Sequence, residues 1–197
     1  MLKIKVKANA ITNLTDARYF AAREVDWLGF CFDETSESHI TPQAMFAMKE
    51  WVDGVKFIGE FRDTKVANIL DHVEKLGLDA VQVDELIGID VLIELSDVLI
   101  FKEINITADS DRDFVANLME QFAPYCAHFI FIIENEMPDW IEEYSENYSV
   151  WIDGNIPIEQ VIDSTFQGIC LKGGVEEKVG FKSFDELDEI LDLLEIS

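Results

Sequence analysis

The chain has few basic residues, few cysteines and no long hydrophobic run. Its 197 residues contain 15 Lys and Arg against 40 Asp and Glu, which gives a formal net charge of −25. Because that charge repels DNA, RNA and anionic lipid surfaces, we expect neither a nucleic-acid nor a membrane partner. No apolar run approaches the roughly 20 residues of a membrane span, which excludes that class as well.

The three cysteines are Cys31, Cys126 and Cys170, an odd number without a CxxC motif. This pattern predicts reduced thiols and a cytoplasmic protein. The first seven residues alternate in polarity and lack the apolar block of a signal peptide. His, Cys and Asp residues do not cluster at metal-ligand spacing, so the sequence predicts no metal and no cofactor.

Short apolar segments alternate with amphipathic ones along the whole chain, of which 49% is hydrophobic. Eight strand–helix units favour a single (β/α)₈ TIM-barrel domain over residues 1–197, with short fourth, sixth and seventh helices. The predicted strands are 4–8, 27–32, 55–61, 80–83, 98–104, 129–133, 149–152 and 167–171. The predicted helices are 14–24, 42–52, 64–76, 87–95, 111–121, 138–147, 157–163 and 183–194.

Glycines follow the last two predicted strands, at Gly154, Gly173 and Gly174. In a barrel, glycines at this corner let backbone N–H groups approach a phosphate, and Lys172 adds a positive charge. Gly180 could begin a short extra helix that faces the anion. The pattern therefore favours a phosphorylated small-molecule ligand, although glycines after strands are also ordinary turn residues.

Two acidic features can be interpreted in two ways. Glu134 follows the sixth strand, where a carboxyl group at the barrel mouth could act as a general acid or be one more surface charge. The loop after the second strand carries Asp33, Glu34 and Glu37, which could bind a metal or simply be solvated. The residues alone leave both alternatives open.

Several segments resemble phosphoribosylanthranilate isomerase. The opening V-K-A-N-A-I-T-N-L-T-D-A at 6–17 is similar to the family's V-K-I-C-G-I-T-x-x-x-D-A. The resemblance continues in G-F-C-F at 29–32, S-E-S-H-I-T-P at 36–42 and V-Q-V at 81–83. It extends through Lys102, Asp139-Trp140 and Gly154 to G-V-E-E-K-V-G-F-K at 174–182.

The resemblance implies a (β/α)₈ barrel and an Amadori rearrangement of an aminoaldose to an aminoketose in tryptophan biosynthesis. Asn9 stands where the family has its basic Cys, and Glu134 stands near the place of its acidic Asp. The remaining positions that match the family's substrate-binding motifs are Ser38, which replaces an Arg, and Gln82, Gly154, Asn155, Lys172, Gly173 and Gly174.

An amide has no basic lone pair near neutral pH, so Asn9 cannot replace a thiolate base. We therefore expect an isomerase-like barrel whose activity is weak or altered, with no assigned base. The alternatives are a non-catalytic barrel that binds a sugar phosphate and a structural or interaction role with a basic partner. The sequence predicts no oligomeric state.

Overall fold

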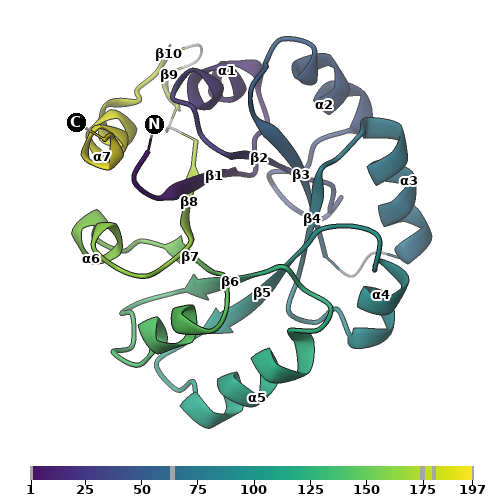
Figure 1. Cartoon of the computed structure of the whole chain (residues 1–197). Helices are drawn as coiled ribbons and strands as arrows, with labels where there is room; N and C mark the ends of the chain where they lie inside the picture. The colour runs from purple at the N-terminus through teal and green to yellow at the C-terminus, as the bar shows by residue number, and fades with distance from the viewer. Residues whose placement is uncertain (1, 63–64, 174–175, 179–180, 197) are drawn as a thin grey trace.

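Eight parallel strands close into a barrel in chain order in a computed structural model, which describes residues 2–62, 65–173, 176–178 and 181–196 (Figure 1). β1 pairs with both β2 and β8, and this pairing closes the cylinder. The strands are β1 (Lys5–Asn9), β2 (Trp27–Cys31), β3 (Lys56–Phe61), β4 (Ala80–Val83), β5 (Ile100–Ile106), β6 (His128–Ile133), β7 (Val150–Gly154) and β8 (Gly168–Lys172). The predicted (β/α)₈ architecture is confirmed.

Helices surround the barrel in Figure 1. They are α1 (Leu14–Ala22), α2 (Pro42–Lys49), α3 (Val66–Leu76), α4 (Ile89–Glu94), α5 (Arg112–Phe122), α6 (Ile158–Ile162) and α7 (Asp185–Leu194), with the 3₁₀ helix η1 (Ile141–Glu146) between β6 and β7. The fourth, sixth and seventh units have helices of 6, 6 and 5 residues, as predicted. The sixth differs in type from the predicted α-helix, because backbone bonds such as Ile141 N–H to Pro138 O span three residues.

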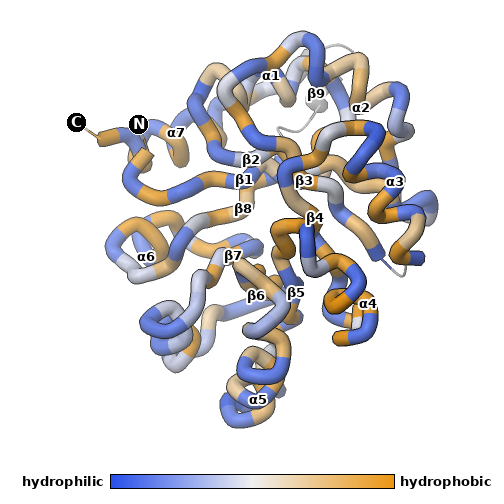
Figure 2. Tube along the Cα trace, turned by 45° about the vertical axis from the view of Figure 1, so that its right-hand side comes forward, coloured by the Kyte–Doolittle hydropathy of each residue, from blue (hydrophilic) through white to orange (hydrophobic). Residues whose placement is uncertain are grey.

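Local sequence signals fix several helix ends. The Asn13 side chain accepts from the Asp16 N–H at the start of α1, and Thr41 caps α2 ahead of Pro42. α3 ends at Gly77, whose φ of 58° favours glycine. Hydrophobic and hydrophilic residues alternate along the helical tubes (Figure 2), which suits helices that cover the barrel with one face.

The barrel has an apolar plug inside its strands. Seven of the eight strands contribute one side chain each to this buried cluster: Trp27, Ile58, Ala80, Phe101, Ile130, Trp151 and Cys170. A larger apolar core lies outside the plug and includes residues of both the strands and the helices. The plug makes the barrel interior a packed core rather than a pore.

A polar layer follows the plug two residues further along the strands. On four strands the residue two positions after the plug residue is polar: Glu60 after Ile58, Gln82 after Ala80, Glu103 after Phe101 and Asp153 after Trp151. Side chains two apart on a strand point to the same side, so these polar groups also face the barrel interior. The interior therefore changes from apolar to polar toward the carboxyl ends of the strands.

The two ends of the described chain meet beside the barrel. The Lys3 N–H donates to Leu194 O, and Leu2 pairs with Glu195. Between β8 and α7, the strands β9 (Glu176–Lys178) and β10 (Phe181–Lys182) pair in antiparallel fashion. Gly180 lies outside the described residues, and the helix expected to begin there is wrong because Phe181 and Lys182 are already paired as a strand. Among the described residues, no helix is long and apolar enough to cross a membrane.

The plug predicts the effect of one small substitution. A Cβ at Gly168 would lie 2.4 Å from the Trp151 ring and 2.8 Å from Lys5 O. We therefore expect Gly168→Ala to lower the free energy of unfolding by about 1–3 kcal/mol through overpacking. Urea unfolding of Gly88→Ala provides the control, since a Cβ there meets nothing within 4 Å. Equal stability of the two variants would contradict the close packing.

Candidate active site

A cavity of about 430 Å³ opens above the polar layer. Fifteen of the residues that the structure describes line it: Asn9, Ala10, Cys31, Ser36, Ser38, Glu60, Phe61, Arg62, Gln82, Asp84, Glu103, Asn105, Ile132, Asp153 and Lys172. They lie near the carboxyl ends of the strands or in the loops that follow, which is the catalytic end of a (β/α)₈ barrel.

A buried ammonium group lies beneath this cavity. Lys7 on β1 is fully buried, and its Nζ lies 2.6 Å from Glu60 Oε1 and also donates to Asn9 Oδ1. Burial alone would lower the pKa of Lys7, but the charge and hydrogen bond of Glu60, together with Cys170 and Asp153, raise it. Gly29 leaves the room for this pair, because a Cβ there would lie 2.0 Å from Glu60 Oε1.

The Asn9 side chain connects the Lys7 ammonium group to Asp153 on β7. Its Nδ2 donates to Asp153 Oδ2 at 2.7 Å, while its Oδ1 accepts from Lys7. Burial raises the pKa of Asp153, although Lys172, Lys7 and the Asn9 hydrogen bond oppose the shift. The next residue, Ala10, has a φ of 51° and donates its N–H to Glu60 Oε1 at 3.3 Å. The amide of Asn9 is thus held on both sides, beside a carboxyl group that is easier to protonate than an ordinary aspartate.

A second amide–carboxyl pair joins β4 and β5. Gln82 Nε2 donates to Glu103 Oε1 at 2.5 Å, and both side chains are buried. Burial raises the pKa of Glu103, and the charges of Asp84 and Glu60 add to the shift against the Gln82 hydrogen bond. The cavity therefore contains two carboxyl groups, the half-buried Asp153 and the buried Glu103, that hold a proton more readily than ordinary ones. Such groups are suited to general acid–base chemistry.

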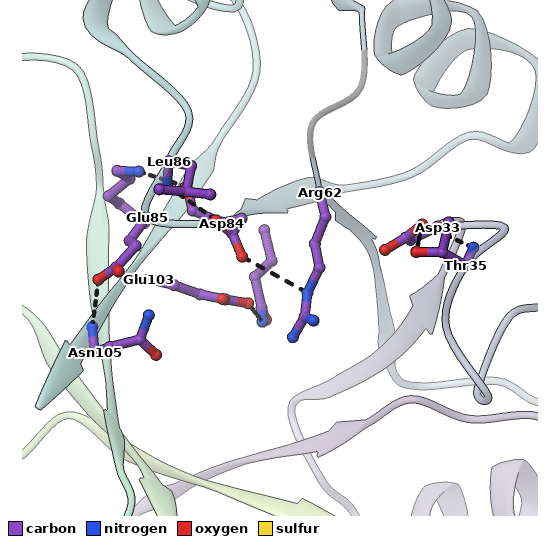
Figure 3. A network of polar contacts seen from close by, with 10 residues as sticks. Asp33, Thr35, Arg62, Asp84, Glu85, Leu86, Glu103 and Asn105 are labelled. Atoms are coloured by element: carbon purple, nitrogen blue, oxygen red, sulfur yellow. Dashed lines mark hydrogen bonds and ion pairs between the residues drawn. The ribbon is translucent and has the colours of Figure 1, made fainter. Parts of the chain in front are cut away.

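The rim carries more exposed charges. Arg62, whose side chain is 65% exposed, extends toward Asp84, and its Nε lies 3.6 Å from Asp84 Oδ2 (Figure 3). The Asn105 N–H donates to Glu85 at 2.9 Å, which ties the ends of β4 and β5 together. Lys172, at the end of β8, is the other cation that lines the cavity. Positive charge therefore sits at the rim, above the Asp153 and Glu103 carboxyl groups.

Four residues predicted for the site meet in this cavity, namely Asn9, Ser38, Gln82 and Lys172. Gly173 follows Lys172 directly. Gly154 ends β7, where a Cβ would lie 2.6 Å from Ile133 O, so close packing with β6 accounts for this glycine. Asn155 lines a separate hollow beside η1 and α6, and Gly174 lies outside the described residues.

Glu134 does not lie where it was expected. It follows the last residue of β6, is exposed and is absent from the cavity lining, whereas Ile132 is the β6 side chain that lines it. The strand ends at Ile133, so the inward alternation does not extend to Glu134. The expectation that its carboxylate points into the mouth is therefore corrected.

Sequence reasoning missed the buried polar layer. Lys7, Glu60, Glu103 and Asp153 were not predicted as site residues, although three of these line the cavity. A signal was present, because each lies in a short apolar strand where a charge is costly unless it is paired. The sequence does not show which of the many other charges pair with them.

The loop after β2 does not form a metal site with its neighbours. Among the residues that the structure describes, no group of three or more His, Cys, Asp or Glu side chains is placed to hold a metal ion. Asp33 instead accepts from the Thr35 N–H and hydroxyl, and these hydrogen bonds lower its pKa. Its carboxylate organises the turn of this loop.

Comparisons with known proteins agree with the barrel. Residues 6–192 match the family model of N-(5′-phosphoribosyl)anthranilate isomerase. A curated isomerase of that name from Caldanaerobacter subterraneus subsp. tengcongensis is 30% identical over 79 residues, and one from Pelobacter propionicus is 39% identical over 80 residues. Each match covers 40% of this chain, and they span 39% and 38% of the relatives' own lengths.

Solved structures show the same fold. The phosphoribosylanthranilate isomerase of Thermus thermophilus superposes with a TM-score of 0.81 at 22% identity, and that of Thermotoga maritima with 0.77 at 22%. A third isomerase structure, in complex with reduced 1-(o-carboxyphenylamino)-1-deoxyribulose 5-phosphate, gives 0.77 at 23%. Each comparison covers 96% of this chain and 97% of the other.

The buried pair of Lys7 and Glu60 predicts a large coupling in stability. Glu60→Leu leaves the Lys7 ammonium without its carboxylate, so we expect a loss of about 3–5 kcal/mol in the free energy of unfolding. The double variant Lys7→Met, Glu60→Leu removes both charges and is expected to recover most of that loss. Urea unfolding of both variants and of the unmodified chain measures the coupling. Additive effects of the two substitutions would contradict the pairing.

Proposed function

The chain belongs to the N-(5′-phosphoribosyl)anthranilate isomerase family, and from this premise we propose that it is an aldose–ketose isomerase of weak or altered activity. The reaction class is an Amadori rearrangement of a phosphorylated sugar amine, as in tryptophan biosynthesis. The observation that carries the proposal is that the buried carboxyl group of Glu103 and the half-buried one of Asp153 line one cavity at the catalytic end of the barrel.

The rearrangement needs one acid and one base. The acid protonates the furanose oxygen as its bond to C1′ breaks, and the base removes the proton from C2′. The resulting enol-amine then takes up a proton at C1′ and gives the ketose, so no oxidant or reductant is required. Asp153 and Glu103 divide these two roles, because their raised pKa values bring them closer to neutral pH than ordinary carboxyl groups.

Asn9 affects the proposed reaction in two ways. It stands at the position of the family's basic Cys and cannot remove a proton. Its hydrogen bond to Asp153 instead fixes the direction of that carboxyl group. The proposed activity on the phosphoribosyl amine is therefore weak, and Asn9 is a positioning residue rather than the base. Glu134, exposed and outside the cavity, has no role in this proposal.

The substitution Asn9→Cys, which introduces a thiol at the cavity, tests the proposal. We expect Asn9→Cys to raise the turnover of phosphoribosylanthranilate by about 10²–10⁴, the usual contribution of a positioned base. Asn9→Ser is the matched control, since serine is close to cysteine in size but has no thiol, and we expect no gain in turnover over the unmodified chain. The assay is fluorescence loss of the substrate, together with growth of a tryptophan auxotroph that lacks this isomerase.

Two further outcomes decide the roles of the carboxyl groups. Asp153→Asn and Glu103→Gln, each placed in the Asn9→Cys background, should remove most of the gained turnover. Asp33→Asn in the same background should not, because Asp33 lies in the loop after β2 and outside the cavity lining. Unchanged turnover in the first two variants, or no gain from Asn9→Cys, would count against the proposed chemistry.

A non-catalytic sugar-phosphate-binding barrel is the second candidate. It is favoured by Lys172, which lines the cavity at the end of β8 and is followed by Gly173. Such a site combines a cation with backbone N–H groups, as phosphate sites of this fold do.

Ribose 5-phosphate tests this phosphate corner. Saturating ligand should raise the melting temperature of the unmodified chain, because it binds the folded state alone. Gly173→Asp places a negative charge beside the site and should abolish the shift, whereas Gly88→Ala should keep it. Absence of any shift at millimolar ligand would remove the support for phosphate binding.

A further inference from the structure

Each side-chain donor group beneath and around the cavity floor that the structure describes already makes at least one hydrogen bond within the protein. Lys7 Nζ donates to Glu60 and to Asn9 Oδ1, and Asn9 Nδ2 donates to Asp153. Gln82 Nε2 donates to Glu103 at 2.5 Å. Each of these amide and ammonium contacts uses a donor that a ligand would otherwise bind.

The floor also offers hydrogen-bond acceptors, one of which is buried without a partner. Gln82 Oε1 is buried and has no hydrogen-bond partner among the described residues, and the side chain as a whole is only 4% exposed. The carboxyl groups of Glu60, Glu103 and Asp153 line the cavity around it, and each makes its described hydrogen bonds through a single oxygen. A ligand that reaches this depth has to donate hydrogen bonds, because a buried acceptor without a donor is unfavourable.

The charged groups of the cavity also differ between its rim and its floor. Among the described residues, the cations that line it are Arg62 and Lys172 at its exposed rim, and the buried Glu103 and the half-buried Glu60 and Asp153 carboxyl groups lie below them. The loop after β2 contributes the hydroxyls of Ser36 and Ser38 to the lining, and no cation. A ligand that is anionic at one end and cationic at the other fits this arrangement, and a carboxylate directed to the floor does not.

We propose that the ligand is a phosphorylated amino sugar, whose protonated amine and hydroxyl groups point to the acceptors around Gln82 while its phosphate stays at the rim. The assignment rests on the proposed function for the phosphate end and adds the chemical class of the buried end. It separates this chain's ligand from an aryl amine that carries a carboxylate. Glu103 and Asp153 then act as acceptors for an ammonium group as well as lining the cavity.

Binding of two sugars that differ by one group tests the assignment. Glucosamine 6-phosphate carries an ammonium group where glucose 6-phosphate carries a hydroxyl, so titration calorimetry at neutral pH isolates the amine. We expect the amino sugar to bind about tenfold or more tightly, the factor typical of a charge-assisted hydrogen bond. Glu103→Gln should reduce that preference for the amino sugar over glucose 6-phosphate. Asp33→Asn, outside this cavity, should keep the preference.

The outcomes separate this assignment from the proposed function. Equal binding of the two sugars, binding of neither, or tighter binding of reduced 1-(o-carboxyphenylamino)-1-deoxyribulose 5-phosphate would overturn the assignment. A preference for the amino sugar that Glu103→Gln removes would support it even if the isomerase assays fail. Isomerase activity with no preference for the amine would support the proposed function and overturn the assignment.

Discussion

The ion pair between Lys7 and Glu60 is the interaction on which the rest of the site depends. A fully buried ammonium group is stable only beside an opposite charge, and Glu60 supplies it at 2.6 Å. The same Nζ holds the Asn9 amide, which in turn directs Asp153. Gly29 provides the space for the pair. Groups on β1, β3 and β7 are thus fixed by one charge, and their positions cannot change independently.

Inside the barrel, the side chains that stabilise the fold and the polar side chains of the cavity lie in two layers, two residues apart along the strands. The aromatic and aliphatic plug supplies packing, and the next inward side chains supply charge and hydrogen bonds. Because strand residues alternate between the two sides, this change adds no charged group to the layer between strands and helices at those positions. Carboxyl groups such as Glu103 and Asp153 can therefore face the cavity while the outer positions beside them stay largely apolar, apart from Lys102 on β5, which is buried over the Phe122 ring.

The site also differs chemically from the motif that the sequence resembles. The family motif K-I-C-G places a thiol and a glycine where this chain has Asn9 and Ala10. Ala10 keeps the left-handed backbone that suits the glycine, with φ at 51°, and its N–H still reaches Glu60. The side chain of Asn9 is a hydrogen-bonding link between Lys7 and Asp153.

The sequence by itself determined the alternation of strands and helices and the short later helices, since these follow from local periodicity. Through resemblance it also pointed to Asn9, Gln82 and Lys172, which line the cavity. It did not identify Glu60, Glu103 and Asp153 among 40 acidic residues. Only the tertiary structure decided this, because strand register and barrel closure bring residues far apart in the chain to one level of the interior. The same register left Glu134 exposed, since β6 ends before its side chain can turn inward.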